Sequence, residues 1–165
     1  MLDRVPWGDR VTLHISDEGS RADLAGILGQ YAPGDHVYCC GPDAYMDAVM
    51  LAATAGGFPE DNRHLEYFAV PEIPDYENHP FTLRLAKTGV DFAVPADQTA
   101  AEVLQQHGFA VDIKCSDGIC GVCKCSLLSG EVEHRDFVLS NKQRAEAIIV
   151  CQSRGTKDSI VEIDL

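Results

Sequence analysis

The sequence predicts an α+β protein of two units, an incomplete α/β segment followed by a small β-grasp sheet. Three observations lead to this prediction. Strand and helix patterns alternate through residues 1–69, a proline-rich stretch covers residues 70–80, and alternating strands surround spaced cysteines in residues 81–165. We therefore expect a first unit at 1–69, a linker at 70–80 and a second unit at 81–165.

The first unit opens with Val11–Ile15, a short β-prone run. Ser20–Asp23 then has the spacing of a capping box, and it predicts a helix that continues to Leu28. Val37–Cys40 ends an apolar run that is typical of a buried strand.

A second helix is expected after this strand. Pro42 suits its first turn, and Gly56–Gly57 suits its end. His64–Phe68 predicts a third strand, so the order of elements is typical of a parallel α/β sheet. Apolar residues fall on one face of the expected helix: Met46, Val49, Met50 and Ala53.

The linker holds three prolines among acidic residues and is not expected to form regular structure. Beyond it, alternation in 81–85 and 90–94 around Thr88–Gly89 predicts a β-hairpin. Thr99–Glu102 and Ser140–Gln143 are expected to cap two helices, and Gly108 is placed to end the first of them. Val161–Leu165 alternates as a last strand.

Four cysteines in the second unit have the spacing x4, x2 and then a long gap, which is the plant-type ligand pattern of a [2Fe–2S] cluster. Gly118 and Gly121 lie inside this loop, where close wrapping and backbone N–H groups aimed at sulfur favour glycine. A four-thiolate zinc site usually uses two short pairs, and disulfides need an oxidising compartment, so both alternatives are weaker. The expected ligands are Cys115, Cys120, Cys123 and Cys151.

Three further cysteines complete an odd total of seven. Cys125 lies on an expected strand, and Cys39 and Cys40 end a buried one, so packing is the default interpretation for all three. An odd number suits four ligands with free thiols better than a set of disulfides.

The net charge of −13 argues against nucleic-acid binding, which depends on Lys and Arg. Residues 1–79 carry 14 acidic and 4 basic side chains, whereas residues 80–165 carry 12 and 9, which supports two separate units. No apolar run approaches the length of a membrane span, and Met1–Pro6 lacks the core of a signal peptide. Reduced thiols favour the cytoplasm.

Three strings together resemble the C-terminal part of the phthalate dioxygenase reductase family, which includes vanillate demethylase reductases. Val37–Pro42 resembles the family's nicotinamide-side motif, and His64–Phe68 resembles the last strand of its nucleotide domain. Cys115–Cys151, with Glu133–Asp136 between the ligands, resembles its ferredoxin domain.

The resemblance implies an oxidoreductase in which NADH reduces FMN and the [2Fe–2S] domain passes single electrons to a Rieske-type oxygenase. It implies cofactor contacts from Cys40, Gly41 and Pro42 near the nicotinamide and from Phe68 near the flavin. The structural alternatives are a strand end that turns into a helix and, for Phe68, a buried strand residue.

The chain departs from the family because it contains no flavin barrel and no glycine-rich phosphate turn before Val11. We therefore expect a truncated reductase that does not oxidise NADH by itself. We also expect residues 1–69 to be less stable than the ferredoxin domain and to expose a sheet edge. The alternative is a free-standing [2Fe–2S] ferredoxin with a vestigial N-terminal extension.

Overall fold

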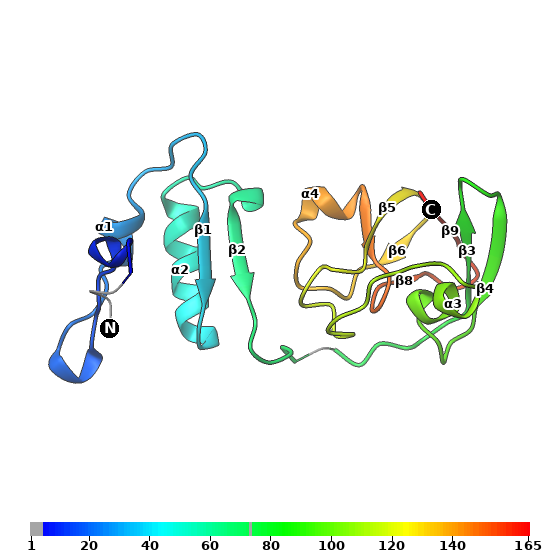
Figure 1. Cartoon of the computed structure of the whole chain (residues 1–165), viewed down its shortest axis with the longest axis horizontal. Coiled ribbons are helices and arrows are strands. Elements are labelled where there is room, and N and C mark those ends of the chain that lie inside the picture. The colour runs from blue at the N-terminus through cyan, green and yellow to red at the C-terminus, as the bar shows by residue number, and fades with distance from the viewer. Residues whose placement is uncertain (1–4, 73) are drawn as a thin grey trace.

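The computed structural model describes residues 5–72 and 74–165, which form two units joined by a long connection (Figure 1). Residues 1–4, which the signal-peptide argument used, and Ile73 of the linker lie outside the described residues. Each unit has its own hydrophobic core, one around α2 and one around the larger sheet. Within the described ranges, no helix has both the length and the apolar character needed to cross a membrane.

The first unit is a parallel strand–helix–strand arrangement made of β1 (Val37–Cys40), α2 (Asp43–Ala55) and β2 (Arg63–Glu66). The buried face of α2 presents Met46, Val49 and Ala53, as the sequence predicted, and these pack with Val37 and Cys39 of β1. The other face of the two-stranded sheet is open: Tyr38 on it is 72% exposed. In the described residues β1 pairs only with β2, so the expected unpaired edge is present.

Two predictions for the start of this unit are wrong. Residues 11–15 form no strand, and Leu13 there is 67% exposed, because no neighbouring strand offers it a hydrogen-bonding ladder. The following helix, α1 (Leu24–Leu28), is capped by the carboxylate of Asp23, which accepts the N–H of Gly26 at 3.1 Å. The Ser20 hydroxyl instead contacts His14 Nδ1 at 3.2 Å.

Within the described residues, three short 3₁₀ segments accompany these elements: η2 (Gly8–Arg10), η3 (Ser16–Glu18) and η4 (Glu60–Asn62). The last of them leads directly into β2. Pro42 is the N-cap of α2 and not a member of its first turn, so the helix begins one residue later than the sequence suggested.

The second unit is a mixed five-stranded sheet in the order β4-β3-β9-β5-β7, which is the β-grasp arrangement that the sequence predicted. Only the central pair β3–β9 is parallel, and the other pairs are antiparallel. The strands are β3 (Phe81–Leu85), β4 (Val90–Val94), β5 (Lys124–Ser129), β7 (Ala147–Ile149) and β9 (Ile160–Ile163).

Helix α3 (Ala100–Gln106) packs into the core of this sheet through Ala101 and Leu104, both fully buried with Leu83 and Ile163. The predicted hairpin, both capping boxes and the turn at Gly108 are confirmed. A second ladder pairs β6 (Val132–Glu133) with β8 (Arg154–Gly155), and α4 (Asn141–Arg144) follows the loop behind the cysteines.

The capping box of α3 generates a stability prediction. Thr99→Ala removes the hydroxyl that accepts the Glu102 N–H at 3.2 Å, and we expect it to lower the free energy of unfolding by about 1 kcal/mol. Thr88→Ala is the control, because the exposed Thr88 hydroxyl makes only a 3.4 Å contact with the Val90 N–H. Denaturation of the two cluster-loaded variants should therefore separate them, and equal stabilities would contradict the role of the cap.

Candidate metal centre

Three of the four predicted ligands lie in the loop between α3 and β5, and the fourth lies in the turn that follows β7. The antiparallel pairing of β5 with β7 sets Lys124 opposite Ile149, so the residues beyond the two strand ends also meet. The Val150 N–H donates to the Cys123 carbonyl at 3.4 Å. Strand pairing thus closes the gap in sequence between Cys123 and Cys151.

The four thiols form two pairs. The pKa of Cys115 responds to the Cys120 thiol and that of Cys123 responds to the Cys151 thiol, so the two members of each pair lie close together. Across the described ranges, no three Cys, His, Asp or Glu side chains converge tightly enough to hold one metal ion. A [2Fe–2S] cluster uses four thiolates, two on each iron, and the four thiols offer that number of ligands.

Backbone N–H groups favour ionised sulfur in the outer pair. Burial raises the pKa of Cys115, but hydrogen bonds from the N–H groups of Asp117, Ile119 and Cys120 and from the Cys120 thiol lower it below its usual value. The Asp117 N–H lies 3.4 Å from Cys115 Sγ. Such donors stabilise thiolate ligands and help to set a cluster's potential.

The inner pair is more buried and shares one hydrogen bond. That bond from Cys151 lowers the pKa of Cys123 to about 6, and its counterpart raises the pKa of Cys151. Both residues are buried, whereas Cys115 is half-buried and Cys120 is exposed. One pair therefore faces the protein interior and the other faces the surface.

The loop conformation explains its glycines. Gly118 and Gly121 have φ values of 72° and 69°, in the left-handed region that glycine favours. A Cβ on Gly118 would lie 3.2 Å from Asp136 Cα and 3.3 Å from the Arg135 carbonyl oxygen. The glycine is therefore required twice, by its backbone angle and by the chain that packs against it.

The segment behind the loop is fixed by its own hydrogen bonds. Asp136 Oδ1 accepts the N–H groups of Val138 and Leu139 at 3.1 and 2.8 Å. The Phe137 N–H donates to the Gly118 carbonyl at 3.1 Å, and Gln152 Nε2 donates to the Ser116 carbonyl at 2.6 Å. The segment that follows Glu133 is thus part of the wall against which the cysteine loop is built.

One polar contact in this wall is incomplete. His134 Nδ1 and Asp136 Oδ2 face one another at 3.6 Å, and neither of these buried atoms has a hydrogen-bond partner. Burial lowers the pKa of His134 despite the nearby carboxylate. The imidazole therefore stays neutral at neutral pH and adds no positive charge beside the loop.

The remaining cysteines are separate from the four. Cys125 packs against the core of the second unit, and burial raises its pKa to about 11. Cys39 is buried in the first unit, and burial raises its pKa as well. Cys40 is exposed, so the packing interpretation is wrong for this residue, because successive strand side chains point to opposite faces and only one face packs on α2.

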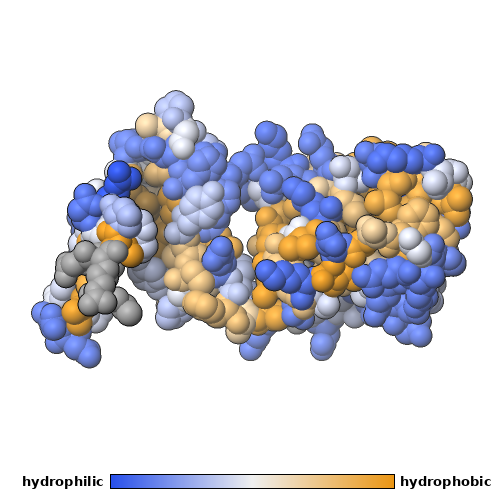
Figure 2. Space-filling model, in the orientation of Figure 1, coloured by the Kyte–Doolittle hydropathy of each residue, from blue (hydrophilic) through white to orange (hydrophobic). Residues whose placement is uncertain are grey.

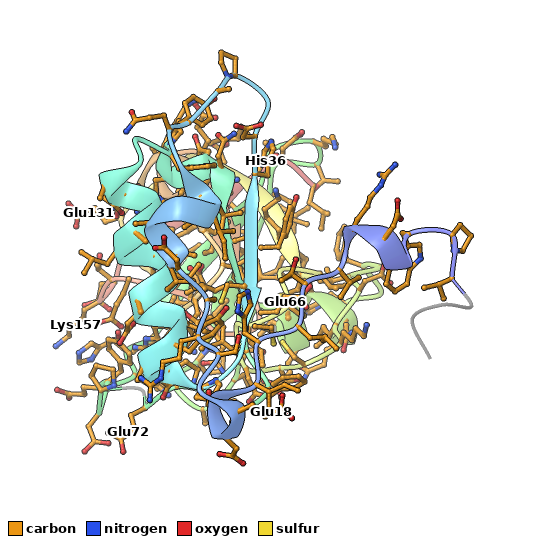
Figure 3. All side chains as sticks on the ribbon, turned by 90° about the vertical axis from the view of Figure 1, so that its left-hand side faces the viewer. Glu18, His36, Glu66, Glu72, Glu131 and Lys157 are labelled. Atoms are coloured by element: carbon orange, nitrogen blue, oxygen red, sulfur yellow. The ribbon has the colours of Figure 1, made fainter. Side chains whose placement is uncertain are left out.

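Cys40–Pro42 and Phe68, which the family resemblance assigns to the nicotinamide and the flavin, follow the carboxyl ends of β1 and β2. Cys40 is the register partner of Glu66, so the carboxyl ends of β1 and β2 bring Cys40–Pro42 near the start of the linker. Figure 3 shows His36 at the start of β1 and Glu66 at the opposite end of the sheet. Phe68 is 91% exposed, so the expectation that it is buried is wrong. It lies beyond the last residue of β2, where no element covers it.

A cleft of about 870 Å³ separates the two units, and Figure 2 shows a hollow at this position. Its walls include Tyr38, His64 and Tyr67 of the first unit and Cys115 and Cys120 of the second. The outer thiol pair therefore faces the α/β unit and not only solvent.

Polar contacts beside the cleft connect the units. Glu60 Oε1 accepts the Asn141 N–H at 3.1 Å, and Asp61 Oδ1 accepts the hydroxyl of Ser140. The rings of Tyr67 and Phe137 have centroids 5.7 Å apart. Sequence reasoning missed these residues, because contacts between partners about eighty positions apart leave no local pattern.

The β-grasp sheet and the two thiol pairs define a plant-type ferredoxin domain, a class that binds a [2Fe–2S] cluster and transfers single electrons. A family model described as a 2Fe-2S iron-sulfur cluster binding domain matches residues 83–156. The cluster that the sequence predicted is thereby supported by both the fold and the family model.

Two curated relatives extend the comparison to nearly the whole chain. The carnitine monooxygenase reductase subunit of Escherichia coli (strain K12) is 38% identical over 159 residues, covering 94% of this chain and 49% of the relative. Phthalate dioxygenase reductase of Burkholderia cepacia is 37% identical over 157 residues, covering 94% and 48%. The chain thus spans about half the length of these relatives.

A solved structure agrees with them. Phthalate dioxygenase reductase, described as a modular structure for electron transfer from pyridine nucleotides to [2Fe-2S], superposes with a TM-score of 0.60 at 34% identity. The match covers 100% of this chain and 54% of that chain. Over 94% or more of its length, the chain is therefore similar to members of the phthalate dioxygenase reductase family.

The thiol arrangement predicts opposite outcomes for two conservative variants. We expect Cys120→Ser to alter or abolish the visible absorption and EPR spectra of the cluster, because it removes one member of the outer pair. Cys125→Ser is the matched control, since its side chain packs in the core and belongs to neither pair. The reverse behaviour would show that the ligand assignment is wrong.

The close packing around Gly118 predicts that alanine is tolerated less well there than at an open glycine such as Gly89. Gly89→Ala introduces a side chain at a φ of 67° with no atom within 4 Å, so it should cost only about 1 kcal/mol of backbone strain. Gly118→Ala adds contacts at 3.2–3.3 Å to the same strain. We expect it to lower the melting temperature further and to reduce cluster occupancy, measured by iron content. Equal effects of the two variants would contradict the packing argument.

Proposed function

We propose that this chain is the C-terminal part of an NADH-dependent, FMN-containing reductase whose ferredoxin domain supplies single electrons to an oxygenase. The observation that carries the proposal is the β5–β7 pairing of a β-grasp sheet, which sets the turn of Cys151 beside the loop of Cys115, Cys120 and Cys123 within the residues that the 2Fe-2S family model matches. These four residues are the proposed ligands. A bound [2Fe–2S] cluster would accept and release one electron at a time.

The partner that we propose is a Rieske-type oxygenase or demethylase in the cytoplasm. Relatives named as reductase subunits of a phthalate dioxygenase and a carnitine monooxygenase support an oxygenase partner. Plant-type clusters near −400 mV lie below Rieske centres at roughly −150 to +300 mV, so electrons would run downhill to such a partner. The negative charge of the first unit argues against nucleic acid as a partner.

The nucleotide side of the proposal rests on the first unit. Cys40, Gly41 and Pro42 follow β1 at the carboxyl edge of the parallel pair, which is where α/β sheets bind ligands. Phe68 follows β2 at the same edge, and its free ring suits contact with a planar cofactor. We assign these four residues to the NADH and FMN side of the complete reductase.

A free-standing electron carrier is the competing interpretation. Residues 5–69 weigh against it, because the similarity to reductases covers 94% of the chain and because Glu60 and Asp61 contact the ferredoxin unit directly. A simple carrier needs neither feature. We therefore favour the reductase.

Spectroscopy of the chain purified without oxygen is the decisive experiment. Dithionite should bleach the visible absorption and produce a rhombic EPR signal of one reduced [2Fe–2S] centre. The cluster-loaded chain alone should not reduce cytochrome c with NADH, whereas addition of a flavoprotein that accepts NADH should start the reaction. Turnover with NADH alone would overturn the division of roles, and a zinc-loaded protein that iron and sulfide cannot convert would overturn the cluster.

A further inference from the structure

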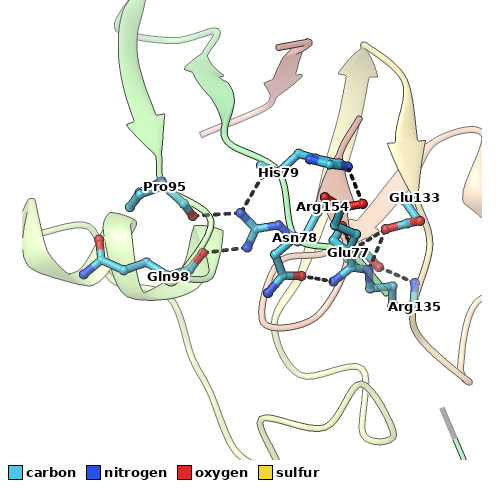
Figure 4. Close-up of polar contacts among 9 residues, drawn as sticks. Glu77, Asn78, His79, Pro95, Gln98, Glu133, Arg135 and Arg154 are labelled. Atoms are coloured by element: carbon cyan, nitrogen blue, oxygen red, sulfur yellow. Dashed lines mark hydrogen bonds and ion pairs between the residues drawn. The ribbon is translucent and has the colours of Figure 1, made fainter. Parts of the chain in front are cut away.

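Two buried arginines lie on the small β6–β8 ladder. Arg154 belongs to β8 and pairs with Glu133 of β6, and Arg135 follows β6 by two residues. Their exposed fractions are only 4% and 8%, although arginine is seldom buried without partners. The partners of both side chains lie largely in the linker and in the loop between β4 and α3 (Figure 4).

Arg154 binds backbone carbonyls from three places. Its guanidinium donates to Gln98 O at 2.6 Å, to Pro95 O at 2.8 Å and to His79 O at 3.1 Å. The same group lies 5.3 Å from the ring centre of Phe81. The last residues of the expected linker are thereby attached to the ferredoxin sheet.

Arg135 holds the linker further upstream. It donates to Asn78 Oδ1 at 2.6 Å and to Glu77 O at 3.5 Å, and its guanidinium lies 4.4 Å from the ring centre of Tyr76. The Glu133 carboxylate accepts two of its N–H groups and balances its charge. A planar guanidinium with this many fixed acceptors is the group best suited to clamp a chain.

The main chain of Arg135 contacts the cysteine loop. Its N–H donates to the buried Ser153 hydroxyl at 3.1 Å, two residues beyond Cys151. Its carbonyl oxygen packs against Gly118 of the ligand loop, as described above. One residue thus touches the linker with its side chain and the cluster loop with its backbone.

We propose that residues 76–79 form a bound strap of the ferredoxin unit and that Arg135 is the positioning residue that ties this strap to the cluster loop. The strap then leaves only residues before Tyr76 to connect it with the first unit. Among residues 69–72 and 74–75, no hydrogen bond to either unit is present. Figure 1 shows the chain running under the second unit before it enters β3.

A shorter tether favours the contact between the units. A proline-rich linker spans about 3.1 Å per residue, so binding of the strap reduces its reach from roughly 34 Å for residues 70–80 to roughly 19 Å for residues 70–75. A shorter tether raises the effective concentration of Glu60 and Asp61 at Ser140 and Asn141. That contact holds Cys115 and Cys120 toward the α/β unit. Its importance for electron delivery rests on the function proposed above, whereas the strap does not.

Proteolysis of the cluster-loaded chain tests the strap. Endoproteinase Glu-C can cut after Glu72 in the free part and after Glu77 in the strap, and both side chains are exposed. In the unsubstituted protein we expect the cut after Glu77 to be about tenfold slower than the cut after Glu72, because it requires local release of the strap. Arg135→Gln should bring the two rates together, as followed by mass spectrometry.

Two matched variants distinguish release of the strap from a general loss of stability. Arg84→Gln removes an exposed arginine that pairs with Asp91 on the same sheet, and it should leave the ratio of cuts unchanged. Asn78→Ala removes a strap contact without touching the ferredoxin core, and it decides the question if Arg135→Gln loses its cluster. Equal cleavage rates after Glu72 and Glu77 in the unsubstituted protein would overturn the proposal of a strap. So would an unchanged ratio of these rates in Asn78→Ala.

Amide exchange tests the positioning role. The Asn141 N–H donates to Glu60 across the cleft, whereas the Ser140 N–H donates to Gln143 inside its own capping box. Asn78→Ala should speed exchange at Asn141 severalfold with Ser140 and the visible spectrum unchanged. Release of the strap with unchanged exchange at Asn141 would contradict the coupling between strap and docking.

Discussion

The pairing of β5 with β7 is the interaction on which the proposed centre depends. It fixes Cys151 beside Cys123, although 27 residues separate them in the chain. The intervening segment supports the loop, because Asp136 accepts the N–H groups of the residues that follow it and the Phe137 N–H donates to Gly118 of the ligand loop. Gln152, directly after Cys151, donates to Ser116 of the same loop. The loop is therefore held from behind by the chain that packs against it.

The two thiol pairs differ in surroundings. The inner pair is buried next to the sheet, while the outer pair lines the cleft toward the α/β unit. Under the proposed function, this difference gives the centre a direction, with the outer pair on the side from which electrons would arrive. The polar contacts of Glu60 and Asp61 and the contact between Tyr67 and Phe137 keep this side covered. Such exposed polar contacts are individually weak, so the length of the connection matters.

The two buried arginines serve the connection and not the proposed centre. The Arg135 side chain donates to the linker and to the Glu133 carboxylate. The Arg154 side chain donates to backbone carbonyls, among them that of Gln98, and neither arginine donates to a cysteine. Near the cysteines, the sulfurs receive backbone N–H groups, and His134 is kept neutral by burial. Backbone dipoles therefore act on the sulfurs directly, whereas the buried guanidinium groups join the linker to the ferredoxin sheet.

Local signals determined much of this protein. Alternation predicted the hairpin, the spacing of Thr99 with Glu102 predicted a capped helix, and the cysteine spacing predicted the cluster, because each depends on neighbours in sequence. Tertiary structure alone decided the rest. Residues 11–15 form no strand because a strand needs a partner, and Cys40 and Phe68 are exposed because no element covers them. The linker end is fixed because Arg135 and Arg154 reach it from 57 and 75 residues away, a distance across which sequence patterns carry no signal.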